Sequence, residues 1–228
     1  AITEKQKGPE SRETMYALMP LIGPYWSQNR LDELEPLYLR ILALTKKIEG
    51  ETSILYASQL TTYGSLLFQR NEYSSALRIH EQAFKIYEAV APSKDDISLA
   101  SPLQILASAY WQTNQKDKAI KIYDRVLAIA DKAGKDNVQL VAGTYWGVAA
   151  QYHYGGRDDL ARPLTQKVID IYTKEIAKLE KTKPDDPMIP ALMGQLGFQF
   201  RQQGDLEKAE KWLAKSVALD EKRGSQFS

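Results

Sequence analysis

Large apolar residues recur along the chain in a pattern that repeats every 42 to 48 residues. Each repeat is marked by an anchor residue, and an asparagine or glycine that favours a turn lies five positions before it. Large apolar residues also lie sixteen, thirteen and nine positions before each anchor, a spacing that predicts one buried stripe on a helix. The anchors are Leu34, Ala76, Ala119, Ala161 and Ala209, and the turn residues are Asn29, Asn71, Asn114, Gly156 and Gly204.

A small residue is predicted where the two helices of each repeat approach each other. Twelve positions before the anchor the residue is glycine or alanine in four of the five repeats, whereas Ile22 takes this position in the first repeat. A missing or short side chain lets the backbone of the next helix come close. The four small residues are Gly64, Ala107, Ala149 and Gly197.

The linkers between the predicted helix pairs contain helix-starting residues. Each of three linkers has an aspartate or asparagine just before the next helix, where its side chain can cap the free backbone donors. These linkers are Ser93–Ser98, Gly134–Asn137 and Lys183–Asp186. Because Pro184 and Pro187 lie in or beside the last of them, with Pro190 close behind, a stiff elbow is predicted before the fifth pair.

The pattern of leucine, small residue, aromatic, turn and alanine resembles the tetratricopeptide repeat, and its long period resembles the version found in kinesin light chains. Residues 117–129 are similar to the second helix of that repeat. The resemblance implies an all-α fold, a right-handed α-α superhelical solenoid of about five helix pairs. The predicted segments are a flexible lead-in (1–13), a single solenoid (14–223) with repeats at 15–50, 51–93, 94–136, 137–183 and 188–223, and a tail (224–228).

Composition narrows the function classes. The 30 basic residues nearly balance the 29 acidic ones, so no global field favours nucleic acid or an acidic membrane surface. Cysteine is absent, which excludes disulfides, thiolate zinc sites and a cysteine nucleophile. No apolar stretch is long enough to cross a bilayer, so we expect a soluble protein without membrane insertion. The compartment stays open: cytoplasmic or, if Ala1 follows a cleaved signal, periplasmic or secreted.

In the family that the chain resembles, the first helices of successive pairs line a concave groove. Residues fifteen, eight and seven positions before the anchors are not used by the buried stripe, and they combine aromatic rings with glutamine amides that suit a bound peptide. The predicted peptide-binding residues are Trp26, Phe68, Gln69, Trp111, Gln112, Trp146, His153, Tyr154, Arg201 and Gln202. The alternative is that these aromatics pack between adjacent first helices and meet no ligand.

Catalytic chemistry is not indicated. His80 is predicted to pack between helices, because Tyr38 and Tyr123 take its position in other repeats, whereas His153 lies in the predicted groove. Neither histidine has a metal-ligating partner three or four residues away. Gly155 and Gly156 lack the spacing and the lysine of a phosphate loop and predict a helix-ending turn. We therefore expect no enzyme, no cofactor, no metal site and no nucleic-acid partner.

The sequence thus predicts a non-catalytic scaffold that binds a protein or peptide in its groove. One alternative is self-association, with a homodimer formed through the last predicted helix, Leu206–Lys222, because Leu206, Leu213 and Val217 would leave an open apolar face. A further alternative is the regulatory domain of a larger protein. The sequence does not name the partner.

Overall fold

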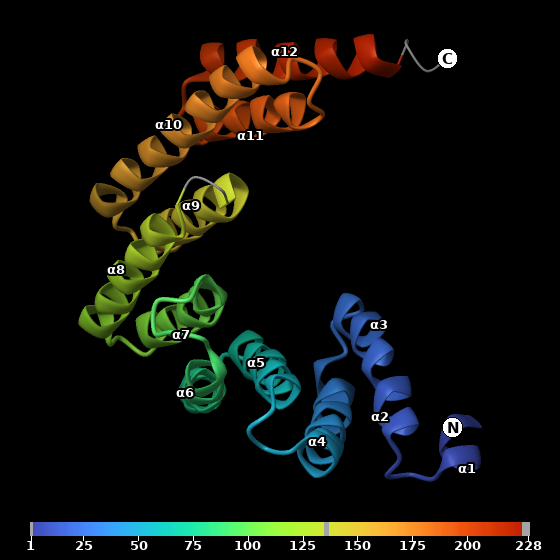
Figure 1. Ribbon diagram of the computed structural model, residues 1–228. Coiled ribbons are helices and arrows are strands. Elements are labelled where there is room, and N and C mark those ends of the chain that lie inside the picture. Colours follow the sequence, from blue (N-terminus) through green and yellow to red (C-terminus); the bar gives the residue numbers. More distant parts are fainter. Residues whose placement is uncertain (1, 135–136, 225–228) are drawn as a thin grey trace. The chain divides into compact units, whose positions relative to one another are not determined.

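The computed structural model describes the backbone of residues 2–134 and 137–224, and every regular element in those residues is a helix (Figure 1). The chain divides into two compact units, Ala1–Ile129 and Ala130–Ser228. The predicted all-α fold of helix pairs is confirmed. The single solenoid over residues 14–223 and its repeat boundaries stay a prediction.

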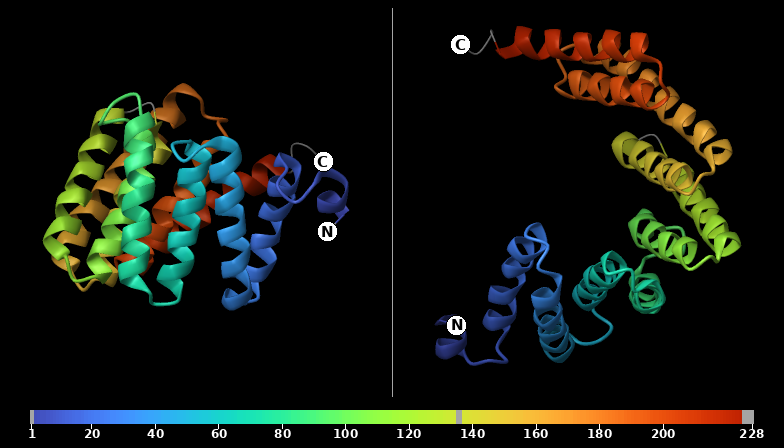
Figure 2. Two further views of the ribbon diagram at one scale, coloured as in Figure 1. Left: turned by 90° about the horizontal axis from the view of Figure 1, so that it is seen from below. Right: turned by 180° about the vertical axis from the view of Figure 1, so that it is seen from behind.

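The first unit holds the first two helix pairs and most of the third. Helices α5 and α6 lie side by side and antiparallel, and α4 and α7 pack against them (Figures 1 and 2). Its elements are α1 (Ile2–Lys7), α2 (Arg12–Leu18), the 3-10 helix η1 (Met19–Leu21), α3 (Ile22–Ser27), α4 (Leu31–Glu49), α5 (Ile54–Gln69), α6 (Tyr73–Val90), the 3-10 helix η2 (Ile97–Leu99), α7 (Ala100–Gln112) and most of α8 (Lys116–Ala133).

The second unit holds the fourth and fifth pairs. Helices α9 and α10 form one antiparallel pair, α11 and α12 form the other, and α10 also contacts α11 (Figures 1 and 2). The unit begins with the last residues of α8, followed by α9 (Val138–Tyr154), α10 (Asp158–Thr182), α11 (Met188–Gln202) and α12 (Leu206–Gly224).

All five predicted turns have the same backbone geometry. The turn residue has a positive φ, between 55° and 80°, which asparagine and glycine tolerate best. In the second pair, Asn71 N donates to Phe68 O and Glu72 N donates to Leu67 O, the two bonds of a Schellman motif. The same two bonds recur in every pair, which is why an asparagine or glycine is required there. The turn residues are Asn29, Asn71, Asn114, Gly156 and Gly204.

The small residues lie where the two helices of a pair touch. A Cβ atom placed on Gly64 would lie 2.5 Å from His80 Cε1, and one on Gly197 would lie 2.7 Å from Leu213 Cγ. His80 is only 4% exposed, so its predicted role in helix packing is confirmed. Burial lowers the pKa of His80 to about 4, because the neutral imidazole is the form that a dry interior favours.

Tyrosine hydroxyl groups join one helix pair to the next. Tyr63 on α5 donates to Glu35 on α4 at 3.1 Å, and Tyr110 on α7 donates to Glu81 on α6. Burial, together with the neighbouring carboxylate, raises the pKa of Tyr110 to about 12 and raises that of Tyr63 as well. In the second unit, burial and Asp131 raise the pKa of Tyr145. These contacts give the second, third and fourth pairs a polar link to the pair before them.

The first repeat departs most from the sequence prediction. Residues 2–7, predicted as part of a flexible lead-in, form α1, which is tied to α4 by an ion pair between Glu4 and Arg40. Pro20 and Pro24 interrupt the first helix of the pair, because proline cannot donate a backbone hydrogen bond. Leu21, which the spacing assigns to the buried stripe, is therefore exposed.

Two of the three predicted linker caps are present. Asp96 Oδ1 accepts from Ser98 N at 2.9 Å, and Asp186 Oδ1 accepts from Met188 N at the same distance. Asn137 occupies the N-cap position of α9, but its side chain caps no backbone group there. Part of that linker, residues 135–136, lies outside the described residues.

Candidate functional site

The second unit contains an open pocket of about 870 Å³ between α9, α10 and α11. Helix α9 contributes aromatic and small side chains, α10 contributes its first three turns, and α11 contributes glutamines. The lining residues are Trp146, Ala149, Ala150, His153, Tyr154, Asp158, Asp159, Ala161, Arg162, Pro163, Thr165, Gln166, Gln199, Gln202 and Gln203. The lining thus combines aromatic and small apolar side chains with a larger number of amide and charged groups.

Four of the predicted peptide-binding residues line this pocket together. They are Trp146, His153 and Tyr154 on α9 and Gln202 on α11. A fifth, Arg201, lies beside the pocket, with its guanidinium 5.6 Å from the ring centre of Phe198, which in turn lies 6.4 Å from the ring of Trp146. The remaining predicted residues, Trp26, Phe68, Gln69, Trp111 and Gln112, belong to the first unit.

In the second, third and fourth helix pairs, the residue eight positions before the anchor contacts the residue five positions further along the chain, across the turn. Trp26 and Leu31 both pack against the cluster around Leu34. The rings of Phe68 and Tyr73 meet edge to face with centroids 5.1 Å apart. We call a contact of this kind a turn clasp. The side chains of Trp26 and Phe68 are both partly buried.

The other two turn clasps are polar. Lys116 Nζ lies 5.4 Å from the ring centre of Trp111. His153 Nδ1 lies 2.6 Å from Asp158 Oδ1, and both side chains are exposed at the mouth of the pocket. The clasp in the fourth pair therefore leaves its side chains accessible from the pocket, unlike the clasp of Phe68 and Tyr73.

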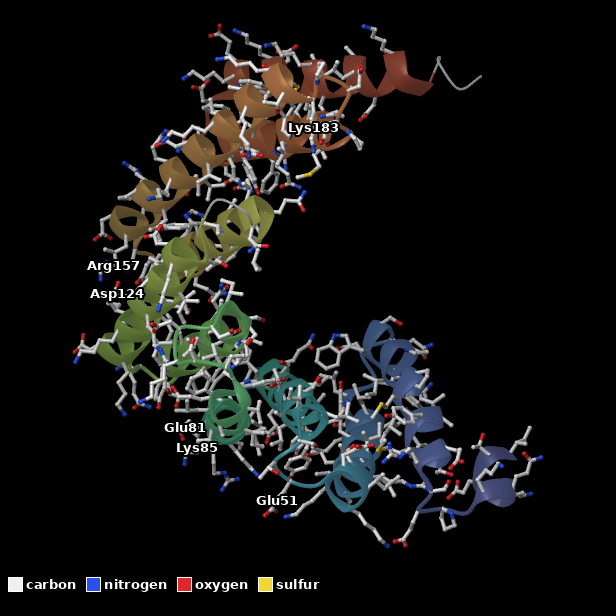
Figure 3. The ribbon with its side chains drawn as sticks, viewed as in Figure 1. Glu51, Glu81, Lys85, Asp124, Arg157 and Lys183 are labelled. Atoms are coloured by element: carbon white, nitrogen blue, oxygen red, sulfur yellow. The ribbon has the colours of Figure 1, made fainter. Side chains whose placement is uncertain are left out.

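The carboxylates at the start of α10 are already paired. Arg157, labelled in Figure 3 at the turn before α10, donates to both oxygens of Asp159 at 2.8 Å and 2.7 Å. This guanidinium holds the pKa of Asp159 below its usual value. Asp158 Oδ1 is hydrogen-bonded to His153, so each of the two carboxylates has a partner at this end of the pocket.

Gln199 is one of the lining residues that the sequence reasoning missed. Its side chain is 2% exposed, and its Oε1 atom is buried without a hydrogen-bond partner. A signal was available: Gln199, Gln202 and Gln203 are spaced i, i+3, i+4 and therefore share one face of α11. The residues of α10, including Gln166, were missed because the prediction considered only the first helix of each pair.

Two classes of site find no support in the described part of the chain. Across residues 2–134 and 137–224, no group of three or more histidine, aspartate or glutamate side chains is arranged to hold a metal ion. Among the helices described there, none is both long enough and apolar enough to pass through a bilayer.

Family models of the tetratricopeptide repeat match residues 14–89 and 103–136 of the chain. The chain is 22% identical over 186 residues to the protein KINESIN LIGHT CHAIN-RELATED 1 of Arabidopsis thaliana. That match covers 81% of this chain but only 29% of the relative, so the chain spans less than a third of the relative's length.

Solved structures of other proteins have a similar fold. The nearly identical TPR-like repeats of a Podosopora anserina protein named for kinesin light chain match with a TM-score of 0.60 and 18% identity, over 94% of this chain and 97% of that one. A Rap protein complexed with Competence and Sporulation Factor matches with a TM-score of 0.59 and 15% identity, over 91% of this chain and 55% of that one. The chain is therefore a tetratricopeptide-repeat protein, similar to kinesin light chains.

Proposed function

We propose that the chain is a non-catalytic scaffold that binds a segment of another protein in the pocket between α9, α10 and α11. The observation that carries this proposal is the exposure of aromatic side chains at a concave site. Tyr154 is 84% exposed and Trp146 is also exposed, although large aromatic side chains are usually buried. Both line the pocket beside glutamine amides, which are groups that suit a peptide backbone.

The fold supports a scaffold. Tetratricopeptide repeats stack helix pairs, and such repeat folds present extended surfaces to protein partners. The Rap protein with a similar fold was crystallised in complex with Competence and Sporulation Factor, so this architecture can hold a bound factor. Because fold alone does not define function, the proposal depends on the pocket and its side chains.

A peptide-binding screen tests the proposal. A display library of short linear peptides is selected on the wild-type chain, and the affinities of the selected peptides are measured for Tyr154→Ala and Trp146→Ala. Loss of these rings should weaken binding by about tenfold or more, since aromatic anchors dominate such contacts. Tyr16→Ala is the matched control, because Tyr16 is an exposed tyrosine on α2 in the other unit.

Two results would refute this function. Either no peptide is retained by the wild-type chain, or the retained peptides bind Tyr154→Ala and Trp146→Ala as tightly as wild type. Circular dichroism of both variants confirms that the fold is intact.

A second candidate function is self-association through α12. Leu206, Leu213 and Val217 are all exposed on this helix, and exposed apolar groups favour association. Sedimentation velocity over a range of protein concentrations tests it. A dimer that Val217→Asp dissociates would support this candidate, whereas a monomer at every concentration would refute it.

A further inference from the structure

We infer that copies of the chain associate head to tail, with α12 of one copy packed against the first helix pair of the next. This inference rests on the second candidate function, self-association through α12, and names the surface that α12 meets. It is carried by the junctions between successive helix pairs. In three of these junctions the second helix of one pair packs on the first helix of the next pair: α4 on α5, α6 on α7 and α10 on α11.

One apolar position recurs in these second helices. It lies eight residues after each anchor, and in the first two pairs its side chain packs in a cluster with residues of the following first helix. In the fifth pair the residue is Val217, which is 55% exposed, and no helix follows α12 in the part of the chain that the structure describes. The five residues are Leu42, Phe84, Leu127, Ile169 and Val217. Helix α12 therefore carries the stacking surface of the repeat, on which another first helix can pack.

The first pair of the chain offers the matching surface. In the α6–α7 junction, Phe84 packs against a cluster that includes Leu106, thirteen positions before its anchor. The same position in the first pair is Leu21, which is 44% exposed because prolines interrupt its helix. In a head-to-tail contact Val217 would therefore pack against Leu21 of the next copy, and both side chains would leave water.

Opposite charges recur at the junctions as well. Arg125 on α8 pairs with Glu88 on α6 at 2.8 Å, and Lys167 on α10 lies 3.7 Å from Asp131 on α8. In both ion pairs the cation lies six positions after its anchor. The acid lies twelve positions after the anchor of the preceding pair.

The two outer pairs carry the same charges. The fifth pair has the exposed Glu221 at the acidic position, and the first pair has Arg40 at the basic position. Arg40 is paired with Glu4 of α1, so α1 supplies the acid that a preceding pair supplies elsewhere. Because α1 buries none of its residues and exposed ion pairs stabilise little, Glu221 of a second copy can replace Glu4.

The remaining charge on this face of α12, Glu210, also has a counterpart. Glu35 takes the same repeat position in α4 and accepts from Arg70 at 2.6 Å, six positions before the next anchor. The first pair has Gln28 at that position, and its side-chain amide can donate to Glu210. The apolar and polar positions of α12 thus agree on one partner, the first pair of a second copy.

Two variants that block opposite surfaces test the inference. Val217→Asp places a charge on α12, and Leu21→Asp places one on the first pair. In sedimentation velocity the mass of wild type should grow with concentration beyond a dimer, since a head-to-tail contact leaves one surface of each kind open. Each variant alone should associate at least about tenfold more weakly, whereas their equimolar mixture should form a dimer with one copy of each. Val90→Asp, at an exposed valine at the end of α6, is the matched control and should associate like wild type.

Introduced cysteines test the contact without disrupting it. The sequence contains no cysteine, so the introduced residues are the only thiols. Under mild oxidation, Val217→Cys mixed with Leu21→Cys should give a disulfide-linked dimer of the two different variants. Val90→Cys mixed with Leu21→Cys should give none.

The outcomes separate this inference from the second candidate function. If wild type is a monomer at every concentration, both are wrong. If Val217→Asp dissociates a dimer that Leu21→Asp leaves intact, and Val217→Cys becomes linked to itself, then α12 pairs with α12. Self-association then stands, and the head-to-tail contact is overturned.

Discussion

The second helix pair, α5 with α6, and the fourth, α9 with α10, use the same repeat positions in opposite ways. In α5 and α6, Gly64 leaves space that the ring of His80 fills. At the equivalent positions, α9 and α10 carry Ala149 and Thr165, and both line the pocket. The position of Thr165 carries a larger side chain in every other pair: Tyr38, His80, Tyr123 and Leu213. The pocket therefore lies where the repeat has its smallest filling residue.

The turn clasps of these two pairs differ in the same sense. Phe68 and Tyr73 join α5 to α6 through an edge-to-face ring contact, and both are partly buried. His153 and Asp158 join α9 to α10 through a hydrogen bond, and both are exposed. One pair uses its side chains to fill its interior, and the other leaves them accessible. Stability should therefore depend more on the α5–α6 positions, and binding more on the α9–α10 positions.

The largest predicted effect is the loss of stability that acid causes through His80 in the α5–α6 pair. The pKa of His80 is lowered from 6.5 to about 4, so the folded state favours the neutral ring. The stability that this represents is present above pH 6.5 and is lost as the pH falls toward 4, because the unfolded chain binds the proton first. The full loss is roughly 3 kcal/mol. Urea unfolding between pH 7 and pH 4 measures it.

The control for this prediction is His80→Tyr, which places at this position the residue found in two other repeats. Carboxylates titrate in both proteins, so the difference between the two pH profiles isolates His80. Identical slopes for wild type and His80→Tyr would show that the imidazole does not titrate as its burial requires.

The next largest loss of stability is expected when a methyl group is added at Gly64. In Gly64→Ala the new Cβ would lie 2.5 Å from Cε1 of the His80 ring, which is buried. Overpacking of a core costs about 1–3 kcal/mol, partly offset by up to about 1 kcal/mol from the higher helix propensity of alanine. A net loss of about 2 kcal/mol in the free energy of unfolding is expected from urea titration.

Gly197→Ala is the matched comparison in the fifth pair. Its new Cβ would approach Leu213, whose side chain is 39% exposed and can rotate away, and would lie 3.2 Å from Ala209 O, a contact that a small backbone shift relieves. The change should therefore stay within about 1 kcal/mol. The double variant Gly64→Ala/His80→Ala has a shorter side chain at position 80, so most of the clash should be removed. A double-mutant cycle measures this interaction energy between the two positions. Equal losses for Gly64→Ala and Gly197→Ala would contradict the account.

The sequence predicted the helix pairs because their causes are local. A positive φ at residues such as Asn71 and Gly204 demands asparagine or glycine, and this requirement is visible at a fixed distance from each anchor. The close approach at Gly64 and Gly197 likewise demands a small residue at a fixed offset. Each rule holds within a single pair, so one sequence shows it several times.

The pocket could be predicted only in part, because its causes are not local. Trp146, His153, Tyr154 and Gln202 followed from the register of the first helices. The pocket also depends on a residue of the second helix being smaller than its counterparts, and on Gln199 lacking a partner. The turn clasps were missed for a similar reason, since the prediction treated each helix face separately and did not consider contacts across the turn.

Filling the pocket is the sharpest test of why the two pairs differ. Ala149→Gly/Thr165→His gives the fourth pair the two residues of the second pair, so an imidazole should occupy space that is open in wild type. The affinity of peptides selected on wild type should fall by about tenfold, equivalent to about 1.4 kcal/mol. Because a packed ring replaces open space, the free energy of unfolding should change by less than about 1 kcal/mol.

Thr182→His, at the exposed end of α10, is the control and should change neither the peptide affinity nor the free energy of unfolding. If the double variant folds and still binds those peptides with wild-type affinity, the missing ring does not create the binding site, and the two pairs differ for another reason.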